Sequence, residues 1–335
     1  SNSIARSTAS IITGGAQNIL VSNEPNPEIH ANVISGGEAN VIHLSNMAAI
    51  FGGRKNTVDS ANYGSILGSQ DSVVYDSTAP SVVGGASNTV RGDVSIILGG
   101  LNNKIEQYSE RSVIAGGGHG TPSKGNSIGE PFGSAWTGRS LPGTRSDSSG
   151  IFGGENNHIN GSLIKSALNN FTIGSSYSCV GAGEESAVFS SSIVGAYRSE
   201  ILNLDGVGPL RNLGFSHIFG GDCNLILMDQ PSADLYSCGI FGGHQNGINN
   251  TINLAGTPQA PWFHVTTTTG EAARGVQSSN ILGGVGNSIT NLAGSGFDYN
   301  SICSTILGGH SNVITSSMGS TILGGGSVVD IRIPF

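Results

Sequence analysis

Residues 50–58 read IFGGRKNTV, a stretch whose residue types could do chemistry. A Gly-Gly pair in a loop can cradle a phosphate, because glycine lets backbone amides approach an anion closely. Residues 82–90, however, read VVGGASNTV, which is nearly the same motif. A phosphate loop occurs once, between one strand and one helix, so the repetition indicates a scaffold and not a nucleotide site.

Each of two long segments contains one of the two tryptophans, and both segments could bind a ligand. Residues 129–145 read GEPFGSAWTGRSLPGTR, and residues 256–270 read GTPQAPWFHVTTTTG. Aromatic faces beside polar groups suit sugar rings, and loops on a rigid scaffold are where binding usually occurs. In the alternative interpretation each tryptophan anchors its own loop to the scaffold. The predicted ligand-binding residues are Trp136, Arg139, Trp262, Phe263 and His264.

Carboxylates and histidines offer weaker signals for catalysis or metal binding. A glycosidase needs two carboxylates about 5–10 Å apart, and nothing in the sequence pairs the four that lie between repeats. Those four are Glu130, Asp205, Asp229 and Asp234. His244 and His310 share one position of the repeat, but the copy between them has Val285 there. We therefore predict no catalytic residue, no metal site and no cofactor, with a polysaccharide-degrading enzyme as an alternative.

These candidates must be positioned by a repeat that covers nearly the whole chain. Its template is [Ile/Val]-x-Gly-[Gly/Ser/Ala]-x-x-[Asn/Ser]-x-[Ile/Val/Leu]. Strict copies start at Ile12, Ile34, Ile50, Ile66, Val82, Ile97, Ile151, Ile193, Ile218, Ile240, Ile281 and Ile306, and degraded copies at Ile114, Thr172 and Ile322. Internal repetition of this extent predicts one elongated repeat domain over residues 1–335, with major insertions at about 118–148 and 250–278.

Composition narrows the classes of protein further. Glycine makes up 53 of 335 residues and charged residues only 11%, but the strictly periodic Ile and Val argue against disorder. A net charge of −8 argues against binding to nucleic acid, which needs a basic surface. The sequence contains no run of 18 or more apolar residues, so we predict no insertion into a membrane. The sequence starts with polar residues and shows no signal peptide. A mature or trimmed chain would also lack one, so this does not argue against export.

When the copies are aligned, positions (columns) with a fixed residue type alternate with variable ones, which is typical of strands with one buried face. Each copy should therefore be a strand, a tight Gly-Gly turn and a second strand. Starts spaced by about 16 residues are too short for helical repeats or propeller blades, so we predict an all-β solenoid, or β-roll, of about 15 coils. A recurrent asparagine should stack in a structural ladder with amide-to-amide hydrogen bonds. Its members are Asn18, Asn40, Asn56, Asn88, Asn103, Asn157, Asn224, Asn246, Asn287 and Asn312.

The variable column beside the first Ile is often apolar, and a two-strand coil is too narrow to bury it. An exposed apolar stripe predicts a protein interface, and three chains around a common axis would cover it, so we expect a homotrimer. In the alternative, a wider single-chain solenoid points both columns inward. This column contains Phe51, Leu67, Val83, Leu98, Phe152, Phe219, Phe241, Leu282, Leu307 and Leu323.

The four cysteines lack the C-x-x-C spacing of metal sites and occupy different places relative to the template. We predict small buried or half-buried hydrophobic side chains, and not a metal or disulfide framework. They are Cys179, Cys223, Cys238 and Cys303.

The Ile-x-Gly-Gly-x-x-Asn-x-Ile coils resemble the left-handed β-roll head repeats of trimeric autotransporter adhesins. They are equally similar to the Gly-Gly-x-x-Asn repeats of phage tail-fibre and tailspike shafts. The similarity covers most of residues 10–330 and implies trimers, a virion or cell surface, and attachment to a host. The chain lacks the heptads of an adhesin stalk and ends on IRIPF, which favours a virion fibre or spike.

Taken with this resemblance, the sequence predicts an extracellular structural and receptor-binding protein. Its scaffold would carry loops that attach to a cell-surface ligand, most simply a glycan. Besides the polysaccharide-degrading tailspike enzyme, a self-assembling extracellular filament is an alternative, because open solenoid ends expose unpaired strand edges.

Overall fold

The computed structural model describes most of the repeated coils. The described residues are 1–7, 9–21, 31–107, 109–118, 125–129, 149–154, 157–159, 171–173, 179–180, 186–189, 192–196, 200–203, 211–214, 216–228, 235–236, 238–250, 279–291, 304–315 and 319–326. All regular structure in these ranges is β-strand. They contain no helix long and apolar enough to cross a membrane.

The chain divides into two compact units. Unit 1 comprises Ser1–Glu130 and Ser146–Asn157, and unit 2 comprises Pro131–Arg145 and His158–Phe335. The expectation of a single elongated domain over 1–335 stays a prediction, and each unit is described by itself below.

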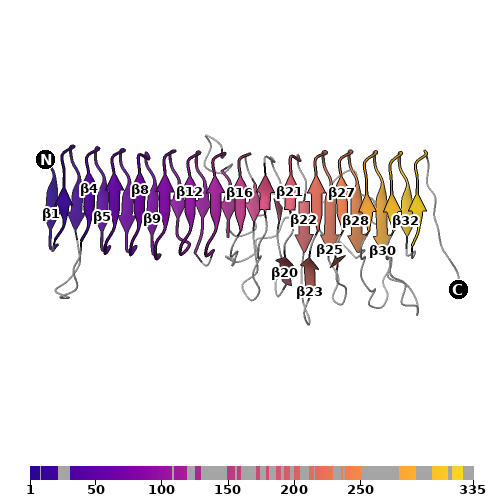
Figure 1. Ribbon diagram of the computed structural model, residues 1–335, viewed down its shortest axis with the longest axis horizontal. Helices are drawn as coiled ribbons and strands as arrows, with labels where there is room; N and C mark the ends of the chain where they lie inside the picture. Colours follow the sequence, from indigo (N-terminus) through magenta and orange to yellow (C-terminus); the bar gives the residue numbers. More distant parts are fainter. Residues whose placement is uncertain are drawn as a thin grey trace, which may run out of the picture. The chain divides into compact units, whose positions relative to one another are not determined.

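Unit 1 consists of two parallel sheets whose strands alternate along the chain (Figure 1). The strand before each Gly-Gly turn belongs to the Gly-Gly sheet: β2 (Ile11–Ile12), β4 (Val33–Ser35), β6 (Ala49–Phe51), β8 (Ser65–Leu67), β10 (Ser81–Val83), β12 (Ile96–Leu98), β14 (Val113–Ala115) and β16 (Gly150–Phe152). The strand after each ladder asparagine belongs to the Asn sheet: β1 (Ser3–Ala5), β3 (Ile19–Val21), β5 (Val41–His43), β7 (Thr57–Asp59), β9 (Val73–Tyr75), β11 (Thr89–Val90), β13 (Lys104–Ile105) and β15 (Ser127–Ile128). The prediction of an all-β solenoid of stacked parallel strands is confirmed.

Unit 2 repeats this arrangement. Its Gly-Gly sheet contains β18 (Phe171–Ile173), β21 (Ser192–Val194), β24 (His217–Phe219), β27 (Gly239–Phe241), β29 (Asn280–Ile281), β31 (Thr305–Ile306) and β33 (Thr321–Ile322). Its Asn sheet contains β17 (His158–Ile159), β19 (Cys179–Val180), β22 (Glu200–Asn203), β25 (Leu225–Met228), β28 (Gly247–Asn250), β30 (Ser288–Asn291) and β32 (Val313–Thr315).

The core is built from one residue per strand. In β6 the pattern is half-buried, buried, exposed for Ala49, Ile50 and Phe51, as expected when successive side chains point to opposite faces. The central residues are fully buried wherever burial is described in the interior coils, for example Ile50 and Val58 at 0% exposure. The fixed Ile/Val columns of the repeat are thus the two core rows.

The register keeps equivalent residues of successive coils opposite one another. Ser65 pairs with Ala49 on one side and with Ser81 on the other. The degraded copy at Ile114 follows the same rule, because Ile105 pairs with Ile128. Residues 127–128, inside the predicted insertion 118–148, therefore belong to a regular coil.

The two glycines of each turn have different roles. Gly52 and Gly53 both have positive φ, 71° and 83°, a region where glycine is not strained. A Cβ on Gly52 would meet nothing within 4 Å, whereas one on Gly53 would lie 2.1 Å from the carbonyl oxygen of Ser69 in the next coil. Lys55 also has positive φ, 55°, although the equivalent residue is a glycine in only one copy, at Gly286.

The ladder asparagines are buried and bond mainly to the backbone. The Oδ1 of Asn40 accepts a hydrogen bond from the backbone N–H of Asn56 at 3.1 Å. The Nδ2 of Asn40 donates to the carbonyls of Gly36 and Gly53. Amide-to-amide bonds join only some neighbours, such as Asn56 to Asn40 at 3.2 Å. The ladder therefore ties each Gly-Gly turn to the turn of the next coil.

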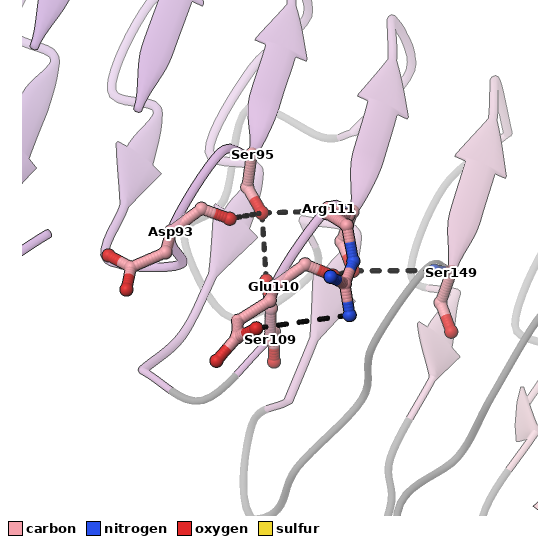
Figure 2. A network of polar contacts seen from close by, with 7 residues as sticks. Asp93, Ser95, Ser109, Glu110, Arg111 and Ser149 are labelled. Carbon is pink, nitrogen blue, oxygen red and sulfur yellow. Dashed lines mark hydrogen bonds and ion pairs between the residues drawn. The ribbon is translucent and has the colours of Figure 1, made fainter. Parts of the chain in front are cut away.

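A second ladder lines the return turns, which lead from the Asn sheet back to the Gly-Gly sheet (Figure 2). The hydroxyl of Ser95 lies 2.8 Å from the carbonyl oxygen of Ser109 and 3.1 Å from that of Asp93. It also accepts from the backbone N–H of Ser112 at 3.0 Å, and the hydroxyl of Ser112 in turn accepts from the backbone N–H of Ser149. Side chains in the return turns thus satisfy buried amides as the asparagines do in the Gly-Gly turns.

Three coils of unit 2 contain an additional sheet. Strands β20 (Ser186–Phe189), β23 (Arg211–Gly214) and β26 (Leu235–Tyr236) pair in parallel, with Leu213 opposite both Val188 and Leu235. These strands follow β19, β22 and β25, so the segments between the repeats there contribute a third sheet.

Candidate functional site

The residues predicted to bind a ligand lie outside the described residues, as do the four isolated carboxylates. The predicted binding residues are Trp136, Arg139, Trp262, Phe263 and His264, and the carboxylates considered for the alternative of an enzyme are Glu130, Asp205, Asp229 and Asp234. They stay predictions.

The histidines of the Gly-Gly turns are described. The bridges run from Asp222 to His244, then to Val285, then to His310, so Val285 separates the two histidines. His244 Nδ1 lies 3.3 Å from Asp222 Oδ2, and His310 Nδ1 lies 2.8 Å from the hydroxyl of Ser311. Within the described ranges, no group of three or more His, Cys, Asp or Glu could hold a metal ion.

The apolar column of unit 1 lies outside the core, on the outer face of the Gly-Gly sheet. Phe51 is 49% exposed and Leu67 40%, and Val83, Leu98 and Phe152 are similarly exposed. Their strand neighbours Ile50 and Ile66 are fully buried. This excludes the wider solenoid with both columns inward, because strand alternation places only one column inside.

Unit 2 has the same exposed column, and two of its members stack. Phe219 pairs with Phe241 in register, and their rings are 5.3 Å apart and nearly parallel at 10°. A Cβ on Gly239 would lie 2.6 Å from Cε2 of Phe241, so the ring of Phe241 covers Gly239. Leu282 and Leu307 extend the exposed column.

Within the described part of unit 1, charged residues occur on the strands of the Asn sheet and not on those of the Gly-Gly sheet. In the described strands of the Gly-Gly sheet, every position is free of Asp, Glu, Lys and Arg. The Asn sheet of unit 1 carries charged groups, which are partnered within the chain. His43 Nδ1 lies 2.9 Å from Asp59 Oδ1, and Arg91 lies 4.4 Å from the ring centroid of Tyr75 and 3.7 Å from Glu106. The Gly-Gly sheet thus presents an uncharged outer face in each unit.

This uncharged face can bury apolar surface against a protein. With about 40% exposure and about 150–250 Å² for a large side chain, the column of unit 1 offers about 350 Å². That matches the largest apolar patch of a typical monomer, which is often functional.

The residues immediately before the core Ile residues also lie on the outer face of the Gly-Gly sheet, and the apolar column alone does not include them. In unit 1 these are small or apolar, and Ser65 and Ser81 bond to each other at 2.8 Å. In unit 2 the equivalent positions include Ser192 and His217. The available signal was the residue immediately before each template Ile, which completes the outer face of the strand.

The two cysteines that the structure describes with their side chains, Cys223 and Cys238, are free thiols and buried. Burial raises the pKa of Cys238 to about 12, which keeps its thiol protonated. The predictions for Cys179 and Cys303 concern side chains outside the description.

The site is thus an uncharged and partly aromatic sheet face on a solenoid with parallel, in-register coils. No protein-family model matches the chain, and no curated protein matches it.

Proposed function

We propose that this protein is a structural and attachment module that assembles with copies of itself through the uncharged face of the Gly-Gly sheet. The observation that carries the proposal is the contrast between the two faces of unit 1. One face exposes a continuous apolar column such as Phe51, Leu67 and Leu98, while the other carries charges already partnered within the chain. Depletion of charge with enrichment of aromatic residues is typical of interface cores.

The assembly we propose is a homotrimer in a virion fibre or spike, or in a surface adhesin. In such a trimer each chain would turn its uncharged face toward its two partners. The extracellular setting rests on the similarity of the Gly-Gly-x-x-Asn repeats to those of tail fibres, tailspikes and autotransporter adhesins. Within it, the inserted segments with Trp136 and Trp262 would bind a host glycan.

Assembly can be tested by measuring solution mass with light scattering. One chain is 34.0 kDa, so a trimer is 3 × 34.0, or about 102 kDa. The double variant Leu67→Glu, Leu98→Glu should reduce the mass to that of one chain, because it places charges in the interface. The matched control Thr57→Glu lies on the Asn sheet and should leave the mass unchanged. A wild-type monomer, or loss of assembly in both variants alike, would contradict the proposed interface.

Attachment needs a separate test. The trimer should bind cells or a glycan array, and Trp136→Ala and Trp262→Ala should weaken binding without changing the mass. Retained binding in both variants would refute the role of the tryptophans. Release of soluble sugar would instead support the enzyme, and end-to-end fibres would support the filament.

A further inference from the structure

His217 is the titratable residue of the uncharged face. It opens β24 on the Gly-Gly sheet, where its register neighbours are Ser192 in β21 and Gly239 in β27. Among the described strands of the Gly-Gly sheet in both units, the other positions are apolar, glycine, serine, threonine or asparagine. His217 is half-buried and can therefore bring a charge to this face.

The contacts of His217 suit a neutral ring. Its Nδ1 lies 2.8 Å from the hydroxyl of Ser192, which can donate to the neutral ring. Its ring centroid lies 5.9 Å from that of Phe219, which in turn stacks on Phe241. Desolvation by these neighbours lowers the pKa of His217 below its usual value.

The surrounding elements provide no carboxylate to this histidine in the described residues. Strands β21 and β27 have no titratable side chain. Asp222 and His244 lie in the Gly-Gly turns after β24 and β27, where they face each other at 3.3 Å. In the Asn sheet, β25 has none and β22 contributes Glu200, which belongs to the sheet on the other side of the buried Ile218.

We propose that self-association through the uncharged face is controlled by pH, with His217 as the switch. The inference rests on the proposed function, because it requires a second copy of this chain to cover the face. Covering His217 removes the water that solvates its protonated form, and a buried unpaired charge is strongly unfavourable. The assembly therefore selects the neutral ring, and acid drives it apart below about pH 6.5, since the pKa of His217 lies below its usual value.

The test measures trimer mass against protein concentration from pH 7.5 to pH 5.2 for wild type, His217→Asn and His244→Asn. If three His217 rings must be neutral, dissociation of wild type takes up three protons. Below the pKa of the free chain, the association constant then falls by up to about 1000-fold per pH unit. His217→Asn keeps a polar group beside Ser192 and should assemble at every pH. His244→Asn, changed in a turn away from the face, should behave as wild type, and circular dichroism checks the fold of each variant.

The outcomes separate this inference from the proposed function. An equal pH dependence in wild type and His217→Asn, or a wild-type trimer that persists at pH 5.2, overturns the switch and leaves the interface standing. A wild-type monomer at pH 7.5 overturns both.

Discussion

A comparison of two adjacent glycines tests how closely the coils approach one another. We consider Gly52→Ala and Gly53→Ala, in the turn between β6 and β7. Both glycines have positive φ, so either alanine costs about 1–2 kcal/mol for the left-handed backbone. For Gly52 the cost ends there, because its Cβ would meet nothing within 4 Å.

Gly53 has two further costs. Its Cβ would lie 2.1 Å from the carbonyl oxygen of Ser69 and 2.5 Å from Nδ2 of Asn56, two atoms that now bond to each other at 2.6 Å. Forcing the coils apart costs about 1–3 kcal/mol, and breaking the buried bond costs about 1–3 kcal/mol more. We expect about 3–8 kcal/mol in total for Gly53→Ala.

Hydrogen exchange of the backbone amides in residues 50–72 measures this difference. A gap of at least 2 kcal/mol between the variants corresponds to about 30-fold faster exchange through local opening in Gly53→Ala. Gly68→Ala is the control, since its Cβ also meets nothing within 4 Å, and it should match Gly52→Ala. If Gly52→Ala and Gly53→Ala exchange within about twofold of each other, close approach is not what fixes the second glycine.

Two other predictions concern buried polar groups. Asn56→Ala should lower the free energy of unfolding by about 2–4 kcal/mol, because the backbone N–H of Ser72 loses its acceptor, Oδ1 of Asn56. Asn56→Ser should lower the free energy of unfolding less, since the hydroxyl of Ser72 already accepts the equivalent hydrogen bond from the backbone N–H of Asn88. Equal urea midpoints for the two variants would count against the ladder. Cys238 should resist iodoacetamide at pH 8 until urea unfolds the protein, because burial raises its pKa to about 12. Its contribution to stability, present below about pH 9, should fall as the pH rises toward 12, and Cys238→Ala should remove that part of the pH dependence.

The strands and core rows could be predicted from sequence because burial imposes a residue type. Ile50 and Val58 face the core, where only an apolar β-former fits, so their columns are uniform. Lys55 shows the opposite case: its positive φ is imposed by the turn, and the residues at this position share no side-chain type. The return-turn ladder was missed for a related reason, because its column includes Ala48 and Ser95, which share little but small size.

The third sheet and the face histidine were harder to predict. The pairing of β20, β23 and β26 spans only three coils, too few to produce a column against a varied background. His217 stands immediately before a template Ile, at a position whose residue type varies from copy to copy. Its importance comes from the charge-free positions around it, and these are recognised only once the register shows which residues share a face. The predicted binding residues, such as Trp136, belong to sequence segments between copies of the repeat, where the repeat pattern gives no constraint.

The constant strand register also bears on how such a protein can change length. Val82 pairs with Ile97, 15 residues on, and Ile114 pairs with Ile151, 37 residues on, yet the strands align identically. Turns absorb every change in spacing, while the strand pairs tolerate none. Loss of residues 50–65 would join Ala49 to Ile66, which takes over the place of Ile50 opposite Ile34. Gene duplication or deletion in steps of one coil thus preserves both ladders, and new loops can be inserted at turns, so length and surface can evolve independently.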